Sequence, residues 1–185
     1  MKASVGHIAQ VQTGVFAKPA ETGEVVYLQA RHFDEHGSLL GELYPDLPSA
    51  EVSDKHLLKG GDVLFAAKGI KNFATVYESH NPPAVASTSF LVLRIPQQEI
   101  LPEYLAWFLN LDDTMGKLRA LAKGTAIPSI TKADMMALEI PLIPMDRQQL
   151  IVRLQALGQR EVQLRMAILQ KRQQWIHQQI SNKLT

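Results

Sequence analysis

Residues 146–183 read DRQQLIVRLQALGQREVQLRMAILQKRQQWIHQQISNK, with no proline and a single glycine, Gly158. Because proline ends helices and glycine weakens them, this composition predicts one continuous α-helix. Asp146, followed three residues later by Gln149, matches a capping box and predicts where the helix begins. At 1.5 Å per residue the helix would be about 57 Å long, more than a small domain needs.

Apolar residues of this segment fall on two lines along the expected helix. The first, which we call seam 1, alternates steps of four and three residues, as in a coiled coil. Seam 1 consists of Leu150, Leu154, Leu157, Glu161, Leu164, Ile168, Lys171 and Trp175. Seam 2 consists of Val162, Met166, Leu169, Gln173, Ile176 and Ile180. The two seams lie roughly 120° apart around the helix.

Two apolar seams predict two partners, because packing against one domain needs only one stripe. The simplest arrangement places one seam against the globular part of the chain and the other against a second long helix. The sequence holds no second helix of this length, so we expect a homodimer or an assembly with another subunit. We assign that contact to the apolar members of seam 1: Leu150, Leu154, Leu157, Leu164, Ile168 and Trp175. Folding of both seams back onto the globular part stays open as an alternative.

Charge divides the 185-residue chain at the same place. Residues 1–144 carry a net charge of −4 and residues 145–185 a net charge of +5. We therefore expect a globular domain at 1–144 and the long helix at 145–185, a length that suits one domain plus an appendage. The basic helix is either a solvated face or a surface for nucleic acid or an acidic partner.

Composition excludes several classes of protein. Hydrophobic residues make up 46% and charged residues 20% of the chain, as in soluble globular proteins. There is no cysteine, which excludes disulfides and thiolate sites. No apolar run reaches 18 residues and the first residues lack the apolar stretch of a signal peptide. We expect a cytoplasmic protein that makes no membrane contact.

The first hundred residues predict short strands separated by turns. Strands are expected at 25–28, 63–66, 74–77 and 90–95, where β-branched and aromatic residues gather. The last of these is apolar nearly throughout, which is typical of a strand covered on both faces.

Beyond residue 100 the pattern becomes helical. Pro102 suits the first position of a helix, and a second helical stretch ends at Lys123-Gly124. Thr131 and Asp134 predict a capping box of a short helix. The prolines in 138–144 restrict that strand to a sheet edge. The predicted fold class is therefore α+β: a mixed domain with a β-rich first part and several helices, followed by one coiled-coil-like helix.

No stretch carries a convincing catalytic or cofactor-binding pattern. The loop at 66–72 holds glycine and lysine without the spacing of a phosphate-binding loop. His32 and His36, with two carboxylates between them, could bind a metal, and a small metal-dependent enzyme or hydrolase stays open as an alternative. The turn at 36–38 and the lack of a third ligand favour a solvated loop. We expect no catalytic residue, metal or cofactor.

Basic and polar loops between the strands could contact DNA. Arginine and lysine can donate to guanine or phosphate, asparagine can pair with adenine, and threonine can hold phosphate. By residue type the candidate contacts are Arg31, Lys68, Lys71, Asn72, Lys123 and Thr125. Residue type alone does not decide between DNA binding and an ordinary polar surface.

Four stretches in succession identify a family. They are LLKGGDVLFAAKG at 57–69, LPEYLAWFL at 101–109, GTAIPSITKADM at 124–135 and IPLIPMDRQQLI at 140–151. Together with the long helix that follows, they resemble the DNA-specificity (S) subunits of type I restriction–modification systems. The resemblance extends over nearly the whole chain.

The resemblance implies a non-catalytic protein that recognises double-stranded DNA. Such subunits have two target-recognition domains separated by two long antiparallel helices, and each domain reads half of a split site. They dock methyltransferase subunits, which bring S-adenosylmethionine, and through them the restriction subunit. This chain has one domain and one long helix, so we expect a half-length form whose homodimer reads an interrupted palindrome. An assembly or regulatory protein that binds the methyltransferase without reading DNA is the alternative.

Overall fold

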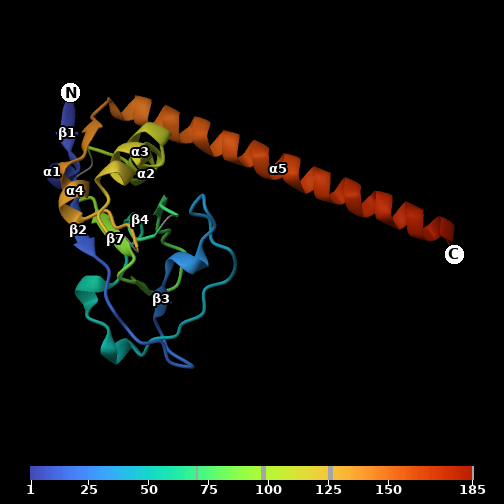
Figure 1. Ribbon diagram of the computed structural model, residues 1–185, viewed down its shortest axis with the longest axis horizontal. Coiled ribbons are helices and arrows are strands. Elements are labelled where there is room, and N and C mark those ends of the chain that lie inside the picture. The colour runs from blue at the N-terminus through green and yellow to red at the C-terminus, as the bar shows by residue number, and fades with distance from the viewer. Residues whose placement is uncertain (70, 97–98, 125–126, 185) are drawn as a thin grey trace.

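The structure of the protein is a computed structural model that describes residues 1–69, 71–96, 99–124 and 127–184. Its elements are β1 (Lys2–Ser4), α1 (Val5–Ile8), β2 (Gln10–Thr13), β3 (Val26–Leu28), the 3-10 turns η1 (Ala30–His32), η2 (Ser49–Glu51) and η3 (Asp54–His56), β4 (Val63–Ala66), β5 (Ala74–Val76), β6 (Ala84–Ala86), β7 (Phe90–Arg94), α2 (Pro102–Leu109), α3 (Asp112–Leu121), α4 (Lys132–Ala137), β8 (Glu139–Pro141) and α5 (Met145–Leu184). Figure 1 shows a domain from which α5 extends as a long rod. This mixed architecture confirms the predicted fold class.

A four-stranded antiparallel sheet in the order β2-β7-β4-β5 lies at the centre of the domain. Because side chains alternate across a strand, Leu91 and Leu93 of β7 pack into a core shared with the helices. Phe90 and Val92 pack into a second core on the other face, with β3 and β6. The prediction that residues 90–95 form a strand covered on both faces is confirmed.

Two smaller sheets complete the domain. β3 pairs with β6 in parallel, and β1 pairs with β8 antiparallel, with Ala3 opposite Ile140. This second pair confirms that residues 138–144 hold an edge strand. The sequence did not predict β1, α1, β2 or β6 as separate elements.

The shorter helices begin as the sequence predicts. Pro102 occupies the first turn of α2. At the start of α4, Thr131 Oγ1 accepts a hydrogen bond from the backbone N–H of Asp134 (3.1 Å), and the Asp134 carboxylate accepts one from the backbone N–H of Thr131 (3.2 Å). The predicted capping box is confirmed.

The long helix is anchored to the domain by Gln148 rather than by the predicted cap. The helix begins at Met145, which places Asp146 in the first turn, so the prediction of a cap at Asp146 is wrong. Gln148 is fully buried. Its amide oxygen accepts from the backbone N–H of Leu101 (2.9 Å), and its Nε2 donates to the carbonyls of Glu99 (3.0 Å) and Ile143 (2.9 Å).

Neither seam of α5 packs against the domain. Contact with the core is made by Ile151 and Val152, beside Gln148. At 100° per residue, seam 1 lies on the opposite side of the helix from these residues, roughly 180° away. Its leucines are exposed, with 66% exposure at Leu157. The expectation that one seam would cover the domain is wrong, because the contact uses a third stripe.

Seam 2 starts past the edge of the domain. By the same geometry it lies roughly 45° from the domain-facing stripe. It begins at Val162, beyond Gln159, the last helix residue that lines the groove between β5, α2 and α5. All the apolar residues of seam 2 are exposed. Among the described helices, α5 included, none is long and apolar enough to cross a membrane.

Candidate nucleic-acid interface

One end of the central sheet gathers the loops that carry the candidate DNA contacts. Because neighbouring strands are antiparallel, β2 and β4 end there, and β7 and β5 begin there. Residues 14–25, 67–73 and 87–89 connect the strands at this end. We call these three connections the loop end of the domain. Gln148 of α5 is hydrogen-bonded to Glu99 and Leu101, which follow the other end of β7. The helix anchor and the loop end therefore lie at opposite ends of the sheet (Figure 1).

Backbone contacts hold the connections of the loop end together. The N–H of Ala67 donates to the carbonyl of Ser89 (2.8 Å), and Val15 forms a β-bridge with Ser87. The N–H of Ser87 donates to the carbonyl of Leu28 (2.8 Å), which joins the end of β3 to the same region. Segments that are far apart in the sequence therefore form one surface.

Lys68 and Lys71 lie in the connection between β4 and β5. Both side chains are exposed, as expected for side chains that could meet phosphate. Gly69 between them has φ +94°, a backbone conformation that residues other than glycine rarely adopt. The turn thus depends on a glycine at this position.

Lys123 reaches the same surface from the end of α3. It exchanges two backbone hydrogen bonds with Ser129 (3.0 and 2.8 Å), and Ser129 also bridges to Lys68. Two lysines that lie 55 positions apart in the sequence are therefore neighbours of one serine. Thr125, another candidate in this area, lies outside the described residues.

Asn72 is buried, unlike the two lysines of the same connection. Its side chain is among the buried polar groups, and the residue is 9% exposed. Its Nδ2 donates to the carbonyl of Ala66 (2.9 Å), and its Oδ1 accepts from Nε of Arg119 (3.2 Å). With both ends of the amide engaged, Asn72 supports the lysine loop and is not placed to read a base edge.

Arg31 lies in η1, just after the β3 end that joins the loop end, and its side chain is exposed. The neighbouring His32 is partly buried, and its Nδ1 accepts a hydrogen bond from the backbone N–H of Gln29 (3.2 Å). Burial, together with the positive charge of Arg31, lowers the pKa of His32, although Asp46 raises it. His32 is therefore held neutral as a structural acceptor.

The histidine pair that suggested a metal does not gather ligands. His36 is exposed, and among the described residues the one carboxylate within 4 Å of its Nε2 is that of Glu35, at 3.7 Å. Within the described ranges, no three histidine, aspartate or glutamate side chains come together as a possible metal site.

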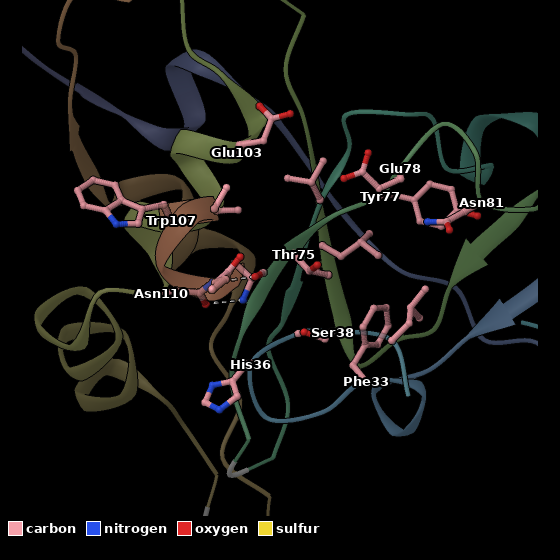
Figure 2. Close-up of a pocket in the computed structure, with 18 of the residues that line it drawn as sticks. Phe33, His36, Ser38, Thr75, Tyr77, Glu78, Asn81, Glu103, Trp107 and Asn110 are labelled. Carbon is pink, nitrogen blue, oxygen red and sulfur yellow. Dashed lines mark hydrogen bonds between the residues drawn. The ribbon is translucent and has the colours of Figure 1, made fainter. Parts of the chain in front are cut away.

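A groove lies elsewhere in the domain, between β5, α2 and the first turns of α5. Its volume is about 440 Å³. Asn110 closes part of the free edge of β5, because its side chain exchanges hydrogen bonds with the N–H and the carbonyl of Ala74 (both 2.8 Å; Figure 2). Capping an edge strand in this way prevents another strand from pairing with it at this point.

The groove differs in charge from the loop end. Glu78 and Glu103 line it, and its only basic residues among those described are His36 and His80 (Figure 2). Burial raises the pKa of Tyr77, which also lines it, to about 12. DNA phosphates would be repelled by the two carboxylates, so the groove is not a candidate for the DNA interface.

Residues 13–171 match the family model of the type I restriction modification DNA specificity domain. No curated protein matches the sequence.

Three solved structures are similar to this chain over most of its length. The S subunit of a type I restriction-modification system from M. genitalium is similar with a TM-score of 0.62 at 14% identity, over 88% of this chain and 40% of that chain. The HsdS subunit from Thermoanaerobacter tengcongensis is similar with a TM-score of 0.65 at 23% identity, over 89% of this chain and 43% of that chain. A chain from work on complex assembly and conformational transition of the type I R-M system is similar with a TM-score of 0.62 at 19% identity, over 88% of this chain and 38% of that chain. The present chain thus spans about two fifths of the length of each.

Proposed function

The chain belongs to the family of type I restriction modification DNA specificity domains, and on this premise we propose that it reads one half of a bipartite site in double-stranded DNA. The observation that carries the proposal is the gathering of exposed basic side chains at the loop end, opposite the anchor of α5. The protein contributes sequence recognition and no catalysis of its own.

The basic side chains at and beside the loop end would meet the DNA backbone. Arg31, Lys68, Lys71 and Lys123 are all exposed and lie on connections that backbone hydrogen bonds fix to one another. Each lysine that meets a phosphate releases counterions, so it strengthens binding and steepens the dependence on salt. Thr125 is proposed as a further phosphate contact, and Asn72 as the support of the lysine loop.

A second copy of the chain would supply the other half of the site. Seam 1 faces away from the domain, and its leucines are 48–66% exposed, which leaves it free to pack on a second helix. A two-fold dimer presents two identical domains, so its target would be an interrupted palindrome.

The charged members of seam 1 favour antiparallel helices. In a parallel two-fold pair, Glu161 would face Glu161 of the second copy and Lys171 would face Lys171, which places like charges at the interface. In an antiparallel pair centred between residues 161 and 164, the charged positions face Leu164 and Leu154 instead. The same alignment sets Leu157 opposite Ile168.

The absence of cysteine from the sequence allows this pairing to be tested by disulfide formation. We expect the double variant Leu157→Cys/Ile168→Cys to form a covalent dimer on mild oxidation, whereas Leu157→Cys alone should not. Efficient cross-linking of the single variant would indicate a parallel dimer and contradict the antiparallel arrangement.

Seam 2 would remain for the methyltransferase subunits. It lies roughly 120° from seam 1, so a helix pair built on seam 1 leaves it uncovered. The methyltransferase would bring S-adenosylmethionine, and through it the restriction subunit would join the complex. No cofactor is proposed for this chain.

Selection from random duplex DNA tests the proposal as a whole. The purified chain, alone and together with the methyltransferase subunit of its own system, is expected to enrich one sequence made of two inverted halves with a fixed gap. Enrichment of two unrelated halves would exclude the homodimer. Formation of the complex without any sequence preference would indicate an assembly or regulatory protein and overturn DNA recognition.

A further inference from the structure

The connection after β2 begins with a rigid extended segment at residues 14–17. The backbone N–H of Gly14 donates to Phe90 (3.0 Å), and that of Val15 donates to Ala86 (2.8 Å). A Cβ on Gly14 would lie 2.0 Å from the carbonyl oxygen of Ser87, so only glycine permits this close approach. The segment is therefore fixed against the strands of the loop end.

Side chains along this segment alternate between the interior and solvent. Val15 and Ala17 pack on a small core formed by Val25, Tyr27, Leu47 and Val85. Since side chains of an extended segment alternate in direction, Phe16 between them must point the other way. It is 85% exposed, the highest value of any aromatic side chain in the described part of the domain.

A buried tyrosine braces the backbone on both sides of Phe16. The hydroxyl of Tyr27 donates to the carbonyl of Val15 (3.0 Å) and accepts from the backbone N–H of Ala17 (3.3 Å). Tyr27 is itself held, because its backbone N–H donates to Oδ1 of Asp46 (2.6 Å). Phe16 is thus an exposed aromatic ring on a fixed support.

The surroundings of Phe16 match the surface already proposed for DNA. Its neighbour Val15 bridges to the 87–89 turn, which in turn bonds to the connection that carries Lys68 and Lys71. Lys18, two residues along, is also exposed. A hydrophobic ring on a surface that also carries lysines fits a ligand with an anionic backbone and flat apolar bases.

We propose that Phe16 makes an apolar contact with the bases of the bound DNA and contributes to sequence preference. The proposal rests on the proposed function, because it places Phe16 on the same DNA. The ring gains free energy by leaving water, and a rigid support keeps the ordering cost low. Its contribution is therefore independent of salt and dependent on the base pairs that it meets, unlike that of the lysines.

The experiment compares variants on the duplex that the wild-type chain selects. Phe16→Ala is expected to lower affinity for that duplex roughly tenfold or more, to leave the salt slope unchanged, and to lose preference at one position of each half-site. Phe16→Tyr keeps the ring and should retain most of the affinity. Lys68→Ala should instead weaken all sequences alike and lower the salt slope by about one.

Leu121→Ala is the control, since it removes an exposed apolar side chain that lines a separate groove with Lys2 and Glu139. It should bind as the wild type does. Unchanged affinity and preference in Phe16→Ala, with a wild-type chain that selects a site, would overturn the contact and leave the proposed function intact. A wild-type chain that selects no sequence would overturn both.

Discussion

The domain and the long helix use apolar residues in opposite ways. In the domain, Leu91 and Val92 of β7 lie on opposite faces of one sheet, and each is buried in a core on its own face. In α5, Leu154 and Leu157 have the same chemistry and stand in solvent. The difference teaches that an apolar pattern predicts a contact surface but does not reveal whether the chain itself supplies the partner. The following experiments probe that difference, from the largest expected effect to the smallest.

Breaking the buried ion pair of the sheet should damage the domain most. Asp62 is 2% exposed, and its Oδ2 lies 2.5 Å from Nη2 of Arg94. The hydrogen bond and charge of Asp62 raise the pKa of Arg94. Asp62→Ala leaves a partly buried guanidinium without its carboxylate, and we expect a loss of about 3 kcal/mol in the free energy of unfolding.

Urea unfolding in a Trp175→Phe background measures this loss, because Trp107 in α2 then remains as the sole tryptophan. Asp54→Ala, at an exposed aspartate of η3, is the control and should leave the midpoint unchanged. A similar midpoint for both variants would show that the ion pair does not stabilise the domain.

Removing the anchor of α5 should loosen the joint between domain and helix. Gln148→Leu loses three hydrogen bonds and leaves the backbone N–H of Leu101 and the carbonyls of Glu99 and Ile143 without that partner. We expect a loss of about 2 kcal/mol and faster hydrogen exchange around the joint. The exposed neighbour gives the control Gln149→Leu. Equal exchange in both variants would mean that Gln148 does not hold the helix.

A charge in seam 1 should affect association without affecting the domain. Leu157→Lys is expected to weaken the proposed dimer roughly tenfold or more, because a lysine would replace a leucine within the contact. Sedimentation over a range of concentrations measures the association, and urea unfolding should remain unchanged. Gln163→Lys adds the same charge outside both seams as a control. A dimer that tolerates Leu157→Lys would place the contact elsewhere on α5.

The capping box of α4 should give the smallest effect. Thr131→Ala is expected to cost about 1 kcal/mol at neutral pH through the lost cap. Hydrogen bonds from the Thr131 side chain and backbone lower the pKa of Asp134 from 3.8, so this stabilisation is present above that value and is lost as the pH falls through the folded-state pKa. Thermal unfolding at pH 7 and pH 3 should show the gap between wild type and variant narrowing in acid. A difference in stability between wild type and variant that is the same at both pH values would show that the cap does not depend on the charge of Asp134.

The sequence predicted elements whose signals are local. The capping box at Thr131 and the first-turn position of Pro102 lie within a few residues of what they stabilise, and both are confirmed. β1 could not be predicted in this way, since its three residues pair with residues near position 140. The cap predicted at Asp146 is wrong because the helical hydrogen bonds already begin at the carbonyl of Pro144, which places Asp146 inside the first turn of α5.

The candidate site was predictable by residue type and not by arrangement. Lys68 and Lys123 were chosen as basic residues that could contact phosphate. That both are neighbours of Ser129 is visible only in the β-bridges of the folded chain. Asn72 was also chosen by residue type, but in the structure its side chain is buried and bonded to Ala66 and Arg119. Phe16 was missed, because its exposure depends on the packing of Val15 and Ala17 beside it.

The sequence by itself determined the long helix and its two seams, because helical hydrogen bonds join residues four apart and the apolar period can be read along one segment. Only the tertiary structure decided which loops meet at the end of the sheet and that neither seam is covered by the domain. Those outcomes depend on contacts between residues distant in the chain, whose partners no local pattern specifies.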